Sequence, residues 1–318
     1  TKYRPPAEGP AGAAIVRNDT GVAEGGEISI FYDPMIAKLV TWAPTRAQAI
    51  AAQADALDAF YIDGIQHNIP FVSALMQHPR WRSGALSTGF IKEEYPDGFK
   101  SRLPDGETAH VLASVAAHVD HLQNSRKRKI SGQMRQGHRI MFDRERVVMM
   151  ADGAHHIEVV DDDGGLAIRF FDAPDGAETH THVLRSAWVP GEPVWRGTID
   201  GTPAAVLVRP ILNGVNLATR GISTSARVYT RRETALVALM PEKAGADTGK
   251  ALVCPMPGLV KSIAVVVGQE VKAGEALCVV EAMKMENVLR AERDAKVKSI
   301  KAKAGDSLAV DAVIMDFE

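Results

Sequence analysis

The chain has 318 residues, of which 46% are hydrophobic and 24% charged, values typical of a globular protein with room for two or three domains. Its 37 basic and 39 acidic residues give a net charge of −2, and this balance argues against nucleic-acid binding. No apolar run approaches the roughly 18 to 20 residues that span a bilayer, and two cysteines, Cys254 and Cys278, form neither a disulfide framework nor a four-cysteine zinc site.

The first hundred residues combine strand and helix patterns. Residues 27–42 predict strands interrupted at Asp33-Pro34. Thr45 and Gln48 have the spacing of a capping box, which predicts the start of a helix. A second helix is predicted after Asn68, because a proline follows in its first turn. The residues expected on the buried faces of the two helices are Ile50, Ala54, Leu57, Phe71, Leu75 and Met76.

The middle of the chain predicts one long helix followed by many short strands. Apolar residues recur at helical spacing over 107–125. From about 138 to 230, β-prone runs alternate with turn pairs, which indicates an antiparallel meander or barrel curled around or against the helix. The turn pairs are Asp152-Gly153, Gly164-Gly165, Asp175-Gly176, Asp200-Gly201 and Asn213-Gly214.

A polar, turn-rich segment, Pro241 to Lys250, reads as a linker. The residues after it contain an internal repeat, because Val260–Ile263 recurs as Val297–Ile300 at an offset of 297 − 260 = 37. Two copies of a small β unit bury a core only against each other. The sequence therefore predicts a flattened two-fold barrel over residues 251–318.

Lys284 stands between the two repeats, flanked by Met283 and Met285. A residue that joins two pseudo-symmetric halves is expected at an exposed hairpin tip. Such a lysine can be reached by a modifying enzyme and can present a prosthetic group on a rigid support. The preceding linker would let the small domain visit separate active sites.

The segment Glu281–Met285 resembles the biotinylation signature of biotin carboxyl carrier domains, and Pro255–Gly258 stands upstream at the family's spacing, 284 − 257 = 27 residues from Pro257 to Lys284. The resemblance implies biotin attached covalently to Lys284. Two other interpretations are an ordinary surface turn and a lipoyl domain, which shares the two-fold barrel but usually carries its lysine in an Asp-Lys context without paired methionines.

Three segments near the N-terminus, 16–22, 32–39 and 63–68, resemble the C-terminal subdomain of biotin carboxylase. The resemblance implies that Arg17 lies in the active site and stabilises negative charge on biotin during its carboxylation, a task that suits a permanently charged, planar guanidinium. The ATP-binding part of the ATP-grasp fold is expected before these motifs. Because the chain starts at Thr1 and not at Met, we expect residue 1 to lie inside a longer natural chain.

The helix and barrel resemble, less specifically, the domain that joins the biotin carboxylase to the carboxyltransferase in acyl-CoA carboxylase α subunits. This implies docking of a separate carboxyltransferase β subunit. Trp188 and Trp195 are interpreted either as exposed interface anchors or as a pair in the barrel core. His155-His156 and His180-x-His182 have spacings that could ligate a metal, but no third ligand is evident, so we predict no metal site.

The predicted fold class is α+β, mainly β. The predicted domains are the C-terminal subdomain of biotin carboxylase (1–103), a helix with an antiparallel β-barrel for docking (104–244), a linker (245–250) and a carrier domain (251–318). The resemblance implies an enzyme component, the α subunit of an ATP-dependent, biotin-dependent acyl-CoA carboxylase. The order of domains most resembles the propionyl-CoA carboxylases. The alternatives are methylcrotonyl-CoA and acetyl-CoA carboxylases and, from another class, a non-catalytic biotin carrier of a decarboxylase.

The same resemblance implies the cofactors and partners. Biotin is expected on Lys284, and ATP, Mg²⁺ and bicarbonate are expected to serve the complete subunit. Expected partners are the carboxyltransferase β subunit and a biotin protein ligase, within a hetero-oligomer of six α and six β subunits, and neither nucleic acid nor a membrane. The expected location is the cytoplasm of a bacterium, or the mitochondrial matrix of a eukaryote.

Overall fold

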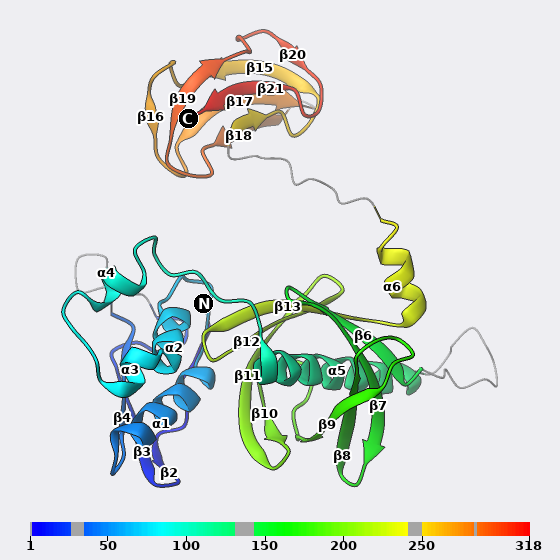
Figure 1. Cartoon of the computed structure of the whole chain (residues 1–318). Coiled ribbons are helices and arrows are strands. Elements are labelled where there is room, and N and C mark those ends of the chain that lie inside the picture. Colours follow the sequence, from blue (N-terminus) through cyan, green and yellow to red (C-terminus); the bar gives the residue numbers. More distant parts are fainter. Residues whose placement is uncertain (1, 27–34, 131–142, 241–249, 283–284) are drawn as a thin grey trace. The chain divides into compact units, whose positions relative to one another are not determined.

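A computed structural model describes residues 2–26, 35–130, 143–240, 250–282 and 285–318. The chain forms two compact units, residues 1–240 and residues 241–318 (Figure 1). Strands outnumber helices in the described residues, so the prediction of a mainly β chain is confirmed. Among the described helices, none has the length and apolar character needed to cross a membrane.

The first part of the larger unit packs short helices against small antiparallel sheets. Strands β2, β3 and β4 form one sheet, and β1 pairs with β5. The elements are β1 (Lys2–Arg4), β2 (Gly9–Ala11), β3 (Ala14–Thr20), β4 (Ala37–Trp42), α1 (Arg46–Asp58), β5 (Tyr61–Asp63), α2 (Ile69–Gln77), α3 (Pro79–Ser83) and α4 (Phe90–Glu94).

The starts of α1 and α2 follow the predicted local signals. The Thr45 side chain accepts a hydrogen bond from the Gln48 amide at 3.3 Å, which satisfies one of the free N–H groups at the start of α1. Helix α2 begins at Ile69 with a proline in its first turn. Of the predicted buried residues, Phe71 is only partly buried. The core between these helices contains Ile50, Ala54, Leu57, Leu75, Met76 and Phe90.

The second part of this unit is a closed eight-stranded barrel in the order β10-β11-β12-β13-β6-β7-β8-β9, curled around helix α5 (Figure 1). Every residue of α5 from Leu112 to Val119 is buried, as expected for a helix surrounded by other elements. The elements are α5 (Gly106–Arg128), β6 (Glu145–Met150), β7 (Gly153–Asp162), β8 (Gly165–Phe171), β9 (Glu178–Arg185), β10 (Val194–Ile199), β11 (Thr202–Ile211), β12 (Gly214–Thr219), β13 (Ile222–Tyr229) and α6 (Arg231–Val237).

Tight turns join neighbouring strands of the barrel. Asp200 and Gly201 connect β10 to β11 with φ angles of 51° and 79°. Two consecutive positive φ values match the type I′ turn that the right-handed twist of a hairpin favours. The turn between β12 and β13 has the same character at Arg220 and Gly221, with φ angles of 52° and 77°.

Helix α1 is tied to the barrel through a buried carboxylate. Asp58, only 4% exposed, accepts hydrogen bonds from the Thr219 hydroxyl at 3.0 Å and the Arg220 amide at 2.8 Å. Burial raises the pKa of Asp58 to about 6, although the Arg220 cation and these hydrogen bonds oppose the shift. The contact joins the first hundred residues to the barrel, so residues 1–240 form one unit although the division at residue 103 remains a prediction.

The second unit consists of two four-stranded sheets in the orders β14-β21-β19-β16 and β18-β17-β15-β20. Adding 37 to the bounds of β15 gives those of β19, and adding 37 to the bounds of β16 gives those of β20. Each sheet has two central strands from one repeat and two edge strands from the other. The strands are β14 (Ala251–Val253), β15 (Gly258–Ile263), β16 (Glu270–Val271), β17 (Ala276–Ala282), β18 (Met285–Arg290), β19 (Ala295–Ile300), β20 (Ser307–Leu308) and β21 (Val313–Phe317).

Candidate functional site

The predicted carrier lysine falls in the sequence between strands β17 and β18. These strands pair antiparallel, and Ala282 at the end of β17 pairs with Met285 at the start of β18. Only Met283 and Lys284 separate the two paired residues, and both lie outside the described residues. Met285 is 67% exposed. The hairpin therefore ends in water, where another protein can reach it.

The Pro-Met-Pro-Gly segment lies against this hairpin. A Cβ atom on Gly258 would lie 2.7 Å from the Glu281 carbonyl oxygen and 2.7 Å from Val280 Cγ1, closer than real contacts allow. Strand β15 therefore approaches β17 at a distance that only glycine permits. The Asn287 side-chain amide also lies 3.6 Å from Met256 Sδ. The 27-residue spacing in the sequence thus corresponds to direct contact between the two segments.

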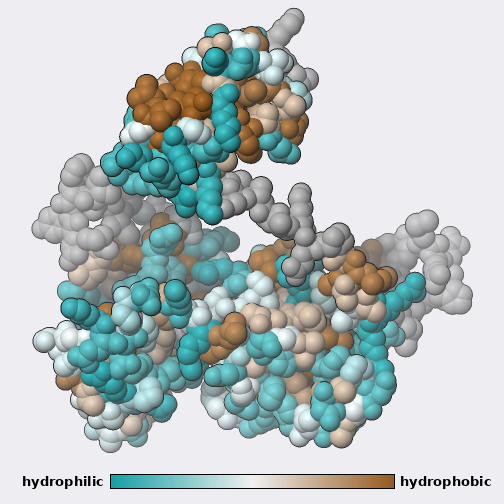
Figure 2. Space-filling view, turned by 45° about the horizontal axis from the view of Figure 1, so that its top comes forward, coloured by the Kyte–Doolittle hydropathy of each residue, from teal (hydrophilic) through white to brown (hydrophobic). Residues whose placement is uncertain are grey.

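Exposed apolar and paired charged groups surround the hairpin. Met256 and Leu259 are 37% and 45% exposed, and Figure 2 shows hydrophobic residues gathered on the surface of this unit. Lys261 forms an ion pair with Glu286 across β15 and β18, and this hydrogen bond raises the pKa of Lys261. Exposed apolar area of this kind is typical of surfaces that contact other proteins.

Arg17 lies on β3 with 64% of its side chain exposed. Its Nε atom lies 2.9 Å from Asp19 Oδ1, and its Nη2 atom donates to Asp19 Oδ2 at 3.0 Å. The carboxylate therefore holds the guanidinium in a two-point contact that fixes its plane. The outer part of the guanidinium remains available to an anion.

The face of the sheet around Arg17 is apolar and open. Ile15 lies on the same face of β3 as Arg17, and their partners across the sheet are Trp42 and Val40. Ile15, Val40 and Trp42 are 48%, 39% and 59% exposed, respectively. Three large apolar side chains beside one arginine are typical of a surface that another part of a protein covers.

Both tryptophans of the middle region lie in the barrel core. Trp188 is 6% exposed and Trp195 is completely buried. The Trp195 indole N–H donates to His118 Nδ1 at 2.8 Å, and the Trp188 indole N–H donates to the Glu192 carbonyl oxygen at 3.0 Å. The core interpretation is confirmed, and the interpretation as exposed interface anchors is wrong, because the helix at the centre of the barrel supplies the partner of Trp195.

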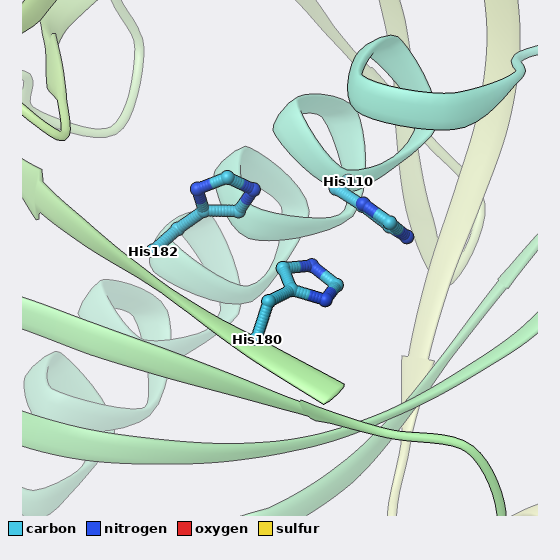
Figure 3. Close-up of side chains that lie close together, drawn as sticks. All are labelled: His110, His180 and His182. Carbon is cyan, nitrogen blue, oxygen red and sulfur yellow. The ribbon is translucent and has the colours of Figure 1, made fainter. Parts of the chain in front are cut away.

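The structure gives the paired histidines a neighbour that their spacing did not reveal. His180 and His182 on β9 lie beside His110 on α5, and one nitrogen of each ring lies within 4.8 Å of the others (Figure 3). His155 pairs with Asp152 at 2.9 Å instead. Sequence reasoning missed His110 because it lies 70 residues before His180 and only the tertiary fold brings the two together.

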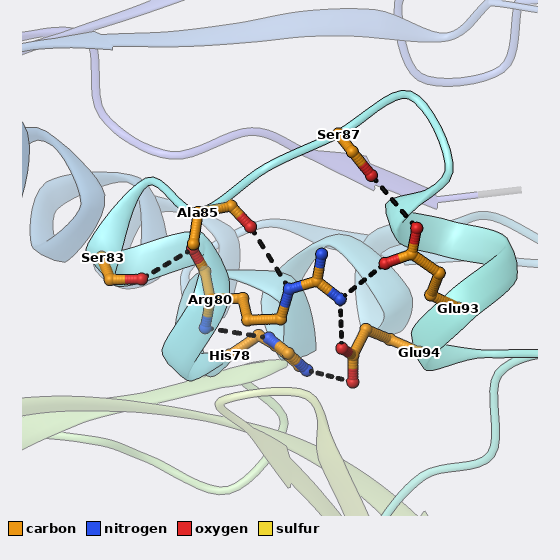
Figure 4. Close-up of polar contacts among 7 residues, drawn as sticks. All are labelled: His78, Arg80, Ser83, Ala85, Ser87, Glu93 and Glu94. Carbon is orange, nitrogen blue, oxygen red and sulfur yellow. Dashed lines mark hydrogen bonds and ion pairs between the residues drawn. The ribbon is translucent and has the colours of Figure 1, made fainter.

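A second polar cluster joins the short helices α3 and α4 (Figure 4). The Arg80 guanidinium contacts Glu93 at 2.9 Å and Glu94 at 2.5 Å and donates to the Ala85 carbonyl oxygen at 3.2 Å. The Arg80 hydrogen bond lowers the pKa of Glu94. His78 accepts a hydrogen bond from the Arg80 amide and contacts Glu94. These contacts hold two short helices together, and we assign the cluster a structural role.

Three family models match successive parts of the chain. Residues 1–93 match the biotin carboxylase C-terminal domain, residues 112–243 match the propionyl-coenzyme A carboxylase BT domain, and residues 250–317 match the biotin-requiring enzyme domain. The three matches occur in the order that the motifs predicted.

Curated relatives match nearly the whole chain. The propionyl-CoA carboxylase alpha chain of Ruegeria pomeroyi is 46% identical over 100% of this chain and 48% of its own length. The mitochondrial propionyl-CoA carboxylase alpha chain of Mus musculus is 33% identical over 95% of this chain and 41% of its own length. The mitochondrial methylcrotonoyl-CoA carboxylase subunit alpha of Dictyostelium discoideum is 29% identical over 92% of this chain and 42% of its own length.

The chain therefore spans about half the length of the curated relatives it matches. Among solved structures, a single-chain, multi-domain long-chain acyl-CoA carboxylase matches with 17% identity and a TM-score of 0.27, covering 100% of this chain and 18% of that chain. That likeness is too low to support an argument.

Proposed function

Because the chain belongs to the α chains of the biotin-dependent acyl-CoA carboxylases, we propose that it carries a carboxyl group on Lys284 between two active sites. The observation that supports this most strongly is the position of the Glu281–Met285 motif at the connection of an open hairpin. That hairpin belongs to a unit built from two repeated halves.

Lys284 would hold biotin through an amide bond between its Nζ atom and the biotin carboxyl group. Bound biotin supplies a ring that accepts and releases a carboxyl group. The work of the chain is to present that ring far from the domain surface. The exposed Met285 and the closely packed Gly258 fit this task, because one leaves the end of the hairpin open and the other fixes its base.

Arg17 is proposed to act in the biotin carboxylase site of the complete subunit. Asp19 orients its guanidinium, which would stabilise negative charge during carboxylation. The apolar face around Ile15 and Trp42 is proposed to pack against the ATP-grasp portion that the longer relatives contain. That portion would bind ATP, Mg²⁺ and bicarbonate.

The remaining parts of the chain receive their proposed roles from the same family. The predicted domains are 1–103, 104–244, the linker 245–250 and 251–318. The barrel would dock the carboxyltransferase β subunit in a hetero-oligomer, and a biotin protein ligase would modify Lys284. The bacterial relative is 46% identical and the mouse mitochondrial one 33%, which favours a bacterial cytoplasm over the mitochondrial matrix.

The linker limits how far the carrier can travel. Ten residues from Pro241 to Lys250 span at most about 33–36 Å when fully extended. The biotinylated lysine side chain adds to that reach. We propose that transfer between the two sites combines this reach with movement of larger parts of the assembly.

Propionyl-CoA is the proposed acceptor. The Ruegeria relative of that name is 46% identical, whereas the Dictyostelium methylcrotonoyl-CoA relative is 29% identical. Acceptor choice would lie in the separate carboxyltransferase, so the α chain supports this assignment only through kinship.

The test is an assay of the complete α subunit with its carboxyltransferase partner. Acetyl-, propionyl- and methylcrotonyl-CoA are compared at equal concentration, with ATP and labelled bicarbonate. We expect propionyl-CoA to give the highest kcat/KM and Lys284→Ala to abolish transfer to every acceptor. Lys298→Ala, which changes another exposed lysine of the carrier unit, should retain activity. A preference for another acyl-CoA would contradict the acceptor assignment, and transfer that survives Lys284→Ala would contradict the carrier role.

A further inference from the structure

We propose that the barrel holds a divalent transition-metal ion, of which Zn²⁺ is the representative, on His110, His180 and His182. These residues lie outside the carrier hairpin and the Arg17 surface. The proposal is independent of the proposed function, since every residue involved belongs to the unit formed by residues 1–240.

The backbone places the three rings together (Figure 3). His180 and His182 alternate along β9 and therefore lie on the same face of the strand. His110 faces them from the first turns of α5. The ring centroids of His110 and His180 are 4.0 Å apart, and those of His180 and His182 are 5.1 Å apart. A closed tetrahedral site would bring the ligand nitrogens to about 3.3 Å, so the 4.8 Å spread requires only small ring movements.

Two of the rings present buried nitrogens without a partner. Nε2 of His180 and Nε2 of His182 are both buried and make no hydrogen bond to the described residues. The His182 side chain is only 6% exposed. A buried polar atom without a partner costs free energy, and a bound ion would satisfy both nitrogens at once.

The outer nitrogens of these rings are already occupied, which leaves the inner ones for a ligand. His182 Nδ1 lies 2.6 Å from Asp200 Oδ2. Burial opposes ionisation of Asp200, but the Val183 N–H and the His182 ring lower its pKa, so the carboxylate accepts the Nδ1 proton. His180 Nδ1 contacts the Thr179 hydroxyl at 3.0 Å. Metal-bound histidines are oriented in this way, with the second nitrogen bonded to a carboxylate or another polar group.

A carboxylate can complete the set. Glu107 Oε1 lies 3.7 Å from His182 Nε2, and the Glu107 side chain is 74% exposed and free to turn inward. Glu107 and His110 are three residues apart on α5 and therefore share one face of the helix. Three imidazoles and one carboxylate suit Zn²⁺ and the divalent ions of similar preference. Burial and the neighbouring rings lower the pKa of His110 and His180, which keeps both imidazoles neutral as metal ligands must be.

The competing explanation is that the rings only pack together. Phe170 stacks on His180 with a centroid distance of 4.4 Å and an interplanar angle of 12°. A purely aromatic cluster would not need the Asp200 contact and would bind no ion. The two explanations therefore differ in metal affinity and in the response to changes at Asp200 and Glu107.

The experiment uses the full chain without a histidine tag, stripped with a chelator and titrated with Co²⁺ and then Zn²⁺. We expect one equivalent of Co²⁺ to give the visible absorption band of a tetrahedral nitrogen and oxygen site, and Zn²⁺ to displace it. The carrier unit contains no histidine, so imidazole ligation reports on residues 1–240 alone. Each change to alanine at His110, His180 or His182 should lower the Zn²⁺ affinity at least tenfold.

Matched variants keep the test decisive. His156→Ala, which changes a histidine on β7 that makes no ring contact with the three described ligands, should bind as the unchanged chain does. Asp200→Asn and Glu107→Gln preserve side-chain shape, so each should fold, and the first should weaken Zn²⁺ binding about 10–100-fold. The proposal is overturned if the band is absent, or if the triple alanine variant, folded by circular dichroism, binds equally well. Full affinity in Asp200→Asn would also overturn it.

Discussion

Arg17 illustrates how a charged side chain can be exposed and still be poised. Its guanidinium is held by Asp19 through two atoms, while 64% of the side chain remains accessible. An exposed ion pair contributes little to stability. Arg17 is therefore a poor candidate for a structural residue, and its orientation by Asp19 has more consequence for an anion than for the fold.

We predict that Arg17→Ala in the complete α subunit slows biotin carboxylation by about 10²–10³-fold, because one preorganised donor of positive charge is lost. Bicarbonate-dependent ATP cleavage measures that step without the carboxyltransferase. Arg4→Ala is the matched control, since Arg4 also has a 64% exposed side chain paired with a carboxylate, Glu24. Near-normal turnover in Arg17→Ala would remove this residue from the site.

His118 is a residue whose protonation is coupled to folding. It is 6% exposed in the centre of the barrel, and its Nδ1 atom accepts the Trp195 indole hydrogen bond. Burial lowers its pKa from 6.5 to about 4, with a smaller effect from His121. The unfolded chain therefore binds a proton at a higher pH than the folded chain does.

We predict that His118 makes the larger unit less stable as the pH falls from about 6.5 toward 4. The unfolded state gains the proton first, so the contribution falls by about 1.4 kcal/mol per pH unit and is complete above pH 6.5. All four tryptophans lie in residues 1–240, so tryptophan fluorescence in denaturant follows this unit. The difference in unfolding free energy between His118→Gln and the unchanged chain should shrink across that pH range, and a constant difference would contradict the assignment.

Local elements were predictable where the signal was local. The helix predicted over 107–125 is observed at Gly106–Arg128, because its apolar spacing continues without a breaker. The predicted turn at Asp200-Gly201 is observed for a similar reason, since both residues tolerate positive φ. The turn at Arg220-Gly221 was missed, because arginine gives no turn signal. Its glycine approaches the Ala74 backbone nitrogen at 2.5 Å from the position of a Cβ, a tertiary constraint.

Contacts between distant elements were not predictable from spacing. His110 meets β9 only because α5 passes along the inner side of the barrel. Trp195 reaches His118 for the same reason. The carrier unit is the exception, because the 37-residue repeat encodes its long-range pairing in the sequence. The carrier lysine itself is recognised by its motif, since Lys284 lies outside the described residues.

The two repeats of the carrier unit cannot form separate cores. Leu277 and Ile314 occupy equivalent positions, 37 residues apart, and both are completely buried in one core. Each sheet takes its edge strands from the repeat that does not supply its centre. We predict that Leu277→Ala and Ile314→Ala each destabilise one shared unfolding transition by about 2–5 kcal/mol.

Calorimetry of the full chain checks this prediction. Both variants should shift the carrier transition and leave the tryptophan-detected transition of residues 1–240 unchanged. Val310→Ala, at a position that is 50% exposed, should shift neither by more than about 0.5 kcal/mol. Separate transitions for the two halves of the carrier unit would contradict the shared core.

At the scale of the whole molecule, the chain combines a large unit that offers surfaces with a small unit that offers one lysine. Residues 1–240 present Arg17 on an open apolar face and enclose a histidine cluster in the barrel. Residues 241–318 present the hairpin whose sequence carries the biotinylation motif. This division of labour suits transfer between fixed sites by a carrier that folds separately.

The most direct test of this account is the intact mass of the chain after coexpression with a biotin protein ligase. We predict an increase equal to one biotinyl group, located on Lys284 by peptide mapping, and capture of the whole chain by streptavidin. Lys284→Ala should remove the increase, and Lys298→Ala should keep it. An unmodified chain, a lipoyl group in place of biotin, or modification at another lysine would contradict the central claim.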